Sequence, residues 1–213
     1  MIIDRRVAER RQRILDAAVG VFAERGYSAS STAQIAAAAG SSKETLYAYF
    51  GDKAGLLRAA LTSLVAAPSV SVTSPALNER TTPEQFETLL HEAAVSLVGD
   101  LMQQPYLALA RIVVAETPRD PSLADLFREA IAGRALSGIA GVLREGQQHG
   151  LVDPDVDLAY AGRAFVGPLL VYVLLDGLLR IGTDVRPPAD ETVRAQIELF
   201  HRCIRQHPDK ETS

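Results

Sequence analysis

Five side chains that can donate hydrogen bonds lie close together near the start of the chain: Lys43, Thr45, Tyr47, Tyr49 and Lys53. Their ammonium and hydroxyl groups suit phosphate oxygens and the edges of nucleic-acid bases. Lys53 also falls in the first turn of an expected helix, where free backbone N–H groups attract an anion. The residue types and spacing therefore indicate a surface that could bind a phosphate backbone.

Two short helices joined by a tight turn are predicted to position these donors. The first spans about residues 31–39, where Ser31 and Gln34 have the spacing of a capping box and Gly40 ends the helix. The second spans about residues 43–49, and either Ser41 or Ser42 could cap it. A longer helix over residues 7–25 precedes them, and another helix follows Asp52. We therefore expect a three-helix helix-turn-helix, whose outward face could enter a major groove about 12 Å wide.

Charge is distributed unevenly along the chain. Residues 1–58 hold nine basic and six acidic residues, a net charge of +3, whereas the remainder has 13 basic and 20 acidic residues, a net charge of −7. Five arginines lie in the first thirteen residues: Arg5, Arg6, Arg10, Arg11 and Arg13. A basic arm of this kind could neutralise phosphates or reach into a minor groove.

The segment from Gly26 to Leu57 resembles the DNA-binding domain of the tetracycline-repressor (TetR) family. The matching residues are Gly26, Tyr27, Ile35, Ala36, Ala39, Gly40, Ser42, Thr45, Leu46, Tyr47, Phe50, Lys53, Leu56 and Leu57. The resemblance implies that Tyr47 and Lys53 clamp phosphates. It also implies that Ser31 and Thr32 face the DNA backbone, and that the residues nearest the base edges are Lys43, Glu44, Thr45 and Ala48. Beyond this motif, the chain resembles the family only in length and helical pattern.

Two positions depart from the family pattern. Position 41 is usually apolar in the family and is Ser41 here, and position 44 is commonly glycine and is Glu44 here. A carboxylate is repelled by phosphates but can accept a hydrogen bond from cytosine N4. Glu44 therefore either specifies a C·G pair or caps its helix, and we slightly favour the cap.

An all-α fold is predicted for the rest of the chain. Apolar periodicity and turn residues indicate helices over residues 83–103, 105–116, 121–149, 155–181 and 189–206. We expect a DNA-binding domain at residues 7–57, a helical effector-binding and dimerisation domain at residues 58–207, and a disordered tail at residues 208–213.

The family resemblance implies a dimer interface and a ligand pocket in this helical body. The last two helices could pair with their copies through Phe165, Leu169, Val173, Val193, Ile197, Phe200 and Ile204, although both could equally be internal core helices. A pocket lined by apolar side chains with a few polar anchors could use Phe86, His91, Met102, Tyr106, Arg111, Glu116 and Tyr172. Each of these residues could instead serve packing or surface ion pairs.

The resemblance implies a cytoplasmic regulator that binds a near-palindromic DNA site as a homodimer and responds to an unidentified small molecule, with repression as the family's common mode. The single cysteine, Cys203, fits a reducing compartment, and the apolar run from Ala164 to Leu175 is shorter than the roughly 20 residues of a membrane span. An enzyme is disfavoured because no nucleophile motif, phosphate loop or convincing metal cluster is present, so no cofactor is expected. The alternative is a helical binding module whose DNA-binding motif has degenerated.

Overall fold

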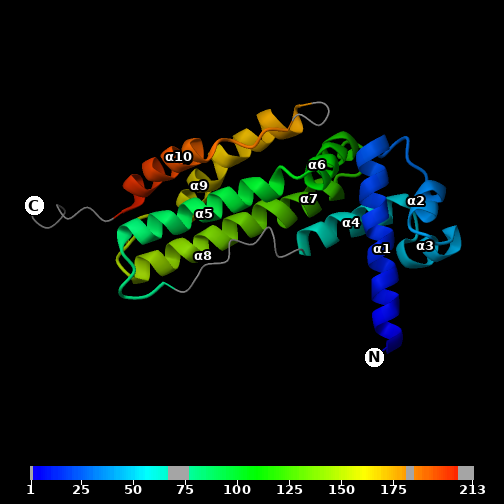
Figure 1. Cartoon of the computed structure of the whole chain (residues 1–213), viewed down its shortest axis with the longest axis horizontal. Coiled ribbons are helices and arrows are strands. Elements are labelled where there is room, and N and C mark those ends of the chain that lie inside the picture. The colour runs from blue at the N-terminus through cyan, green and yellow to red at the C-terminus, as the bar shows by residue number, and fades with distance from the viewer. Residues whose placement is uncertain (1, 67–76, 181–184, 206–213) are drawn as a thin grey trace, which may run out of the picture. The chain divides into compact units, whose positions relative to one another are not determined.

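Every regular element in the described part of the chain is a helix, as predicted (Figure 1). The computed structural model describes residues 2–66, 77–180 and 185–205, so the predicted tail at residues 208–213 lies outside it. The N-terminal elements are α1 (Ile2–Arg25), α2 (Thr32–Ala38), α3 (Lys43–Phe50) and α4 (Lys53–Ala66). They are followed by α5 (Pro83–Leu101), α6 (Gln104–Glu116), α7 (Ser122–Phe127), the π-helical turn η2 (Arg128–Gly133), α8 (Arg134–Gln148), α9 (Leu158–Tyr172), the π-helical turn η3 (Val173–Leu178) and α10 (Asp190–Ile204).

The helices form two compact units. The head unit contains α1 to α4 together with α6 and α7, and the body unit contains α5, α8, α9, η3 and α10. The boundary expected at residue 57 falls inside α4, and α6 and α7 pack with the head unit although the sequence grouped them with the body. The head unit is therefore larger than a three-helix motif.

The core of the head unit closes around α1. Ile14, Leu15, Ala18 and Phe22 are almost completely buried and form the apolar stripe expected from the 3.6-residue period. They meet side chains from α2, α3, α4 and α6, among them Ile35, Leu46, Leu57 and Leu109. Gly40 has a φ of 58°, in the left-handed region that favours glycine, and so permits the tight turn between α2 and α3.

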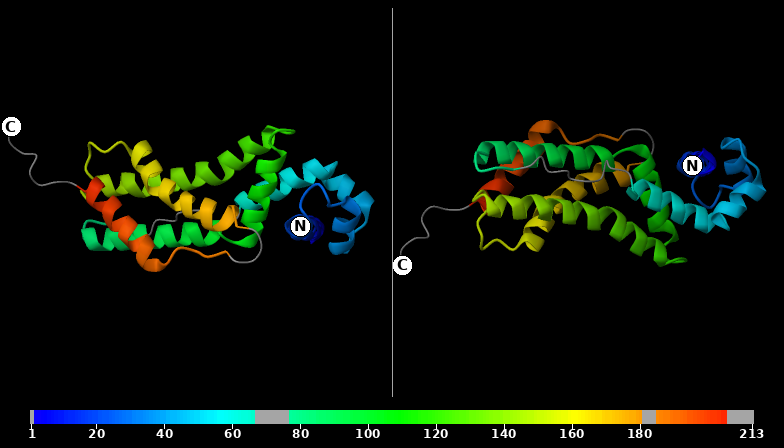
Figure 2. Two further views of the ribbon diagram at one scale, coloured as in Figure 1. Left: turned by 90° about the horizontal axis from the view of Figure 1, so that it is seen from above. Right: turned by 90° about the horizontal axis from the view of Figure 1, so that it is seen from below.

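In the body unit, α9 is the central helix and contacts α8, α5 and α10 (Figure 2). Phe165 and Leu169 of α9 are fully buried, and the Phe165 ring packs against Phe200 of α10 with centroids 5.4 Å apart. A methyl group at Gly146 of α8 would come within 2.8 Å of the Phe86 ring of α5, so this glycine leaves room for that ring.

Six of the seven residues predicted for the dimer interface lie in this intramolecular core: Phe165, Leu169, Val193, Ile197, Phe200 and Ile204. The seventh, Val173, is half-buried at the start of η3. The sequence left open whether these helices are internal, and their buried faces are used inside one protomer. The predicted helix over residues 155–181 corresponds to α9, which contains Pro168, and to η3, which follows it directly and ends at Leu178.

Candidate nucleic-acid interface

Serine caps fix the starts of α2 and α3. Ser31 accepts from the backbone N–H of Gln34 at 3.2 Å, and the Gln34 side chain accepts from the Ser31 N–H at 2.9 Å, which is the predicted capping box. Ser42, rather than Ser41, caps α3 by accepting from the Thr45 N–H at 3.2 Å. Both helices therefore begin at positions set by local hydrogen bonds.

The exposed face of α3 presents Lys43, Glu44, Tyr47 and Ala48, whereas Thr45 and Tyr49 are half-buried. Tyr49 lies beside Phe50 with ring centroids 6.0 Å apart and packs against the core of the head unit. Of the residues predicted for this face, Tyr49 is therefore the one most engaged in packing.

A hydrogen bond links the two short helices across the exposed surface. The hydroxyls of Thr32 on α2 and Tyr47 on α3 lie 3.2 Å apart. The bond orients Tyr47, whose side chain is 47% exposed and so remains open to a partner. Thr32 and Tyr47, predicted separately, thus form one polar feature.

Lys53 is held at the start of α4 by two contacts within the head unit. Its Nζ donates to the Ser30 carbonyl oxygen at 2.7 Å and lies 4.2 Å from the centroid of the Tyr27 ring. Burial lowers the pKa of Lys53, and the nearby Glu116 carboxylate partly opposes this effect. An ammonium has three N–H donors, so this arrangement positions the group and leaves capacity for a phosphate oxygen.

Glu44 makes local contacts in the structure. The pKa of its carboxyl is lowered by a hydrogen bond from its own backbone N–H and by one from the Ser42 hydroxyl. Both contacts belong to the first turn of α3, where a carboxylate also complements the helix dipole. The N-cap of α3 is Ser42, so Glu44 is the second residue of the helix and does not form the capping box with Ser41.

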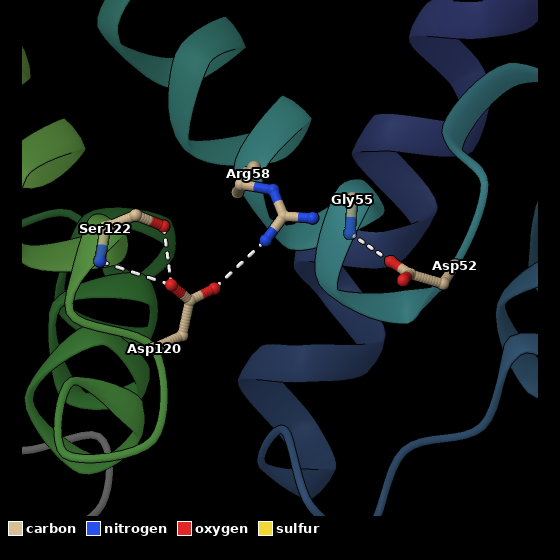
Figure 3. A network of polar contacts seen from close by, with 5 residues as sticks. All are labelled: Asp52, Gly55, Arg58, Asp120 and Ser122. Carbon is tan, nitrogen blue, oxygen red and sulfur yellow. Dashed lines mark hydrogen bonds and ion pairs between the residues drawn. The ribbon is translucent and has the colours of Figure 1, made fainter.

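A polar network joins α4 to the turn between α6 and α7 (Figure 3). Arg58 of α4 donates to Asp120 at 3.0 Å, and the Ser122 hydroxyl donates to the other carboxylate oxygen of Asp120 at 2.5 Å. These contacts, led by the Ser122 hydroxyl, lower the pKa of Asp120. At the N-terminus of α4, Asp52 accepts from the Gly55 N–H at 2.6 Å and so caps the helix.

Glu116, at the end of α6, is buried and points into the head unit. Its carboxylate accepts from the Ser28 hydroxyl at 3.3 Å, in the loop between α1 and α2. The pKa of Tyr27 in the same loop is raised, first by burial and then by the negative charge of Glu116. The sequence reasoning missed Ser28, Arg58 and Asp120, because nothing in their local patterns connects residues separated by 62 or more positions.

The residues proposed for a ligand pocket fall into both units. Phe86, His91, Met102 and Tyr172 lie in the body unit, whereas Tyr106, Arg111 and Glu116 lie on α6 in the head unit. Phe86 and Tyr106 are buried. His91 is also buried, and its Nε2 lies 3.0 Å from Asp190 Oδ1 without the geometry of a hydrogen bond. These seven residues remain candidates for effector contact.

Two family models match this chain. A family model described as "Bacterial regulatory proteins, tetR family" matches residues 14–60, and one described as "Tetracyclin repressor-like, C-terminal domain" matches residues 84–185. No curated protein sequence matches the chain.

Several solved structures have the same fold over nearly the whole chain. A TetR transcriptional regulator from Agrobacterium tumefaciens is 27% identical, with 93% of this chain and 96% of that chain covered and a TM-score of 0.74. The flavonoid-responsive regulator FrrA is 26% identical, with coverages of 94% and 99% and a TM-score of 0.68. A putative TetR-family regulator from Mesorhizobium loti is 24% identical, with coverages of 94% and 99% and a TM-score of 0.78.

Proposed function

Because the chain belongs to the TetR family of bacterial regulatory proteins, whose members are transcriptional regulators and not enzymes, we propose that it represses transcription by binding a near-palindromic operator as a homodimer. A small-molecule effector releases it. The observation that carries the proposal is the exposed face of α3, where Lys43 and the Thr32-bonded Tyr47 are presented by capped helices.

In the proposed complex, α3 enters the major groove. Lys43, Glu44, Thr45 and Ala48 lie nearest the base edges, with Tyr49 beside them. Tyr47 and Lys53 bind phosphates, and Ser31 and Thr32 approach the backbone at the start of α2. The prior bond of Tyr47 to Thr32 and the contacts of Lys53 support these roles, because a restrained donor loses less conformational entropy on binding.

An exposed apolar surface on α9 and η3 supports dimerisation. Val171 on α9, Leu174 and Leu175 on η3, and Leu179 directly after η3 are between 44% and 63% exposed in the single protomer. An 18-residue window within Leu158–Leu178 has a mean hydropathy of 1.7, and only 28% of this window is buried. This helix is long and apolar enough to cross a membrane, and core helices of soluble proteins share the same length and composition. We propose that a second copy covers this surface and that the protein acts in the cytoplasm.

The effector signal is proposed to travel through α6. This helix continues the chain from α5 and carries Glu116, and the following turn carries Asp120. Their bonds to Ser28 and Arg58 connect α6 with the loop before α2 and with α4. A displacement of α6 would therefore move the elements that hold Lys53 and α3. The coupling free energy between effector binding and DNA binding is typically about 1–3 kcal/mol. The similar protein FrrA is described as flavonoid-responsive, which supports control by a small molecule.

The decisive experiment is a selection of randomised duplex DNA with the purified full chain. The winning sequences are then titrated at two salt concentrations, with a Tyr47→Ala, Lys53→Ala variant as the control. We expect a palindromic winner that is bound by a dimer and discriminated from random duplex by at least about 10³-fold. If no sequence is enriched and only weak, salt-sensitive binding is found, the alternative of a helical module with a degenerate DNA head is favoured.

A further inference from the structure

The first turns of α1 project beyond the core of the head unit. The helix begins at Ile2, so the expected basic arm is helical rather than an extended chain that could thread into a minor groove. Residues 5–13 are all exposed, and Ile14 is the first buried residue from position 5 onward. About two and a half helical turns therefore bury no side chain in this protomer.

On one face of these turns, the acidic side chains accept hydrogen bonds from neighbouring side chains. Arg5 donates to Glu9 at 2.8 Å, and Gln12 donates to Asp16 at 2.9 Å. The Ser63 hydroxyl of α4 donates to the Gln12 side chain at 3.3 Å. Both acidic groups on this side, Glu9 and Asp16, are thus already in contact with neighbours.

The adjacent face, about 100° around the helix axis, carries Arg6, Arg10 and Arg13, which we call the arginine stripe. At 100° per residue, the spacing of four and then three residues places them within about 60° around the helix axis. All three side chains are exposed, and none forms a hydrogen bond or ion pair with the described residues.

Arg11 connects this part of α1 to the predicted recognition helix. Its guanidinium carbon lies 5.2 Å from the centroid of the Phe50 ring, and Phe50 is the last residue of α3. Within the head unit, the N-terminal turns of α1 extend past the pair formed by α2 and α3 (Figure 1). DNA bound along α3 would therefore continue past the region of the stripe.

We propose that the arginine stripe binds the phosphate backbone of DNA that flanks the base pairs contacted by α3. This inference rests on the proposed function. Guanidinium groups bind phosphates through paired N–H donors and stay charged at all relevant pH values. The net charge of the whole chain is −4, so three unpaired arginines on one helix face form a local site for a polyanion. The contact adds affinity and operator length without reading sequence.

The test compares an Arg6→Gln, Arg10→Gln, Arg13→Gln variant with the wild type on two duplexes. One duplex is the selected operator alone, and the other carries about ten additional base pairs on each side. Each lost phosphate contact should reduce the slope of log K against log salt by about 0.9. We expect the wild type to bind the long duplex with the steeper slope, and the variant to lose this increment.

Two further variants separate charge from other effects. Arg80→Gln, Arg128→Gln, Arg144→Gln makes the same charge change at exposed positions outside α1 and α3, and should keep the wild-type slope. Arg6→Lys, Arg10→Lys, Arg13→Lys keeps the charge and should retain most of the increment. Glutamine and lysine resemble arginine in helix propensity, and circular dichroism checks that α1 remains folded.

If the wild type selects an operator and the stripe variant has the same salt slope on both duplexes, the proposed role of the stripe is overturned. The proposed function then stays intact. A lysine variant that loses the increment as fully as the glutamine variant also overturns it, because charge would not be the cause. A wild type that enriches no sequence overturns the proposed function itself.

Discussion

Lys53 has contacts inside the head unit and a proposed role on its surface. The ammonium is held by the Ser30 carbonyl and the Tyr27 ring, so the side chain is already ordered before DNA arrives. A DNA phosphate would bind the pre-ordered Lys53 ammonium at the start of α4, where the helix dipole adds to the attraction.

Replacing Lys53 with methionine should weaken binding to every DNA sequence. Methionine keeps an apolar stem over Tyr27 but removes the charge, so the salt slope should fall by about 0.9 per half-site while sequence preference is unchanged. Fluorescence anisotropy at several salt concentrations measures the slope. Glu44→Ala is the companion variant, because a residue near base edges should change sequence preference instead. An unchanged slope for Lys53→Met would remove Lys53 from the DNA contacts.

Asp120 makes the stability of the head unit depend on pH. Its folded-state pKa lies below the ordinary value of 3.8, first because of the Ser122 hydroxyl and further because of Arg58. Because the pKa is lower in the folded state, the contribution of ionised Asp120 to the free energy of unfolding is complete above the unfolded-state pKa. It is lost as the pH falls through the folded-state pKa.

Asp120→Asn should therefore be less stable than the wild type at pH 7, and this difference should shrink as the pH falls below about 4. Urea unfolding followed by circular dichroism across this range measures the difference. Asp125→Asn is the control, because Asp125 pairs with Arg128 on the surface three residues away. A difference that stays constant with pH would contradict the role assigned to the ionised Asp120.

At the scale of elements, the starts of α2 and α3 depend on single hydroxyl groups. The sequence allowed either Ser41 or Ser42 to cap α3, and the structure assigns the bond to Ser42. The two adjacent serines therefore provide an internal comparison in one turn of the head unit.

Ser42→Ala should lower the free energy of unfolding by about 1 kcal/mol, because an N–H in the first turn of α3 loses its acceptor. Ser41→Ala should change it by less than about 0.5 kcal/mol, as expected for a substitution away from such a contact. Urea unfolding of both variants measures the difference. Equal effects would mean that the cap does not determine where α3 begins.

At the scale of the whole molecule, the proposed operator symmetry requires two heads held together. Six of the seven predicted interface residues are buried within the protomer, so our proposal assigns the contact to the exposed faces of α9 and η3. Leu174 and Leu175 are 44% and 54% exposed there and are the most direct positions to change.

Leu174→Asp combined with Leu175→Asp should convert the dimer to a monomer, because two carboxylates would be buried without partners. Sedimentation velocity gives the assembly state, and palindrome affinity should fall with it. Val95→Asp, on α5 and 41% exposed, is the control and should remain dimeric. A dimeric double variant would place the interface elsewhere.

Much of the head unit could be predicted from the sequence, because its signals act within a few residues. The apolar stripe of α1, the Ser31 capping box, the turn at Gly40 and the cap at Asp52 each depend on groups within one or two helical turns. The same short-range pattern carried the resemblance to the family, which the comparisons confirm.

Only the tertiary structure decided which apolar faces are covered by the protomer itself. Phe165 lies on a helix with more than one apolar face, and periodicity cannot tell an internal face from one covered by a second copy. The bonds of Asp120 to Arg58 and of Glu116 to Ser28 join segments 62 and 88 residues apart. Local sequence determines where a helix begins and which residues share a face, whereas the neighbours of that face depend on how the whole chain folds.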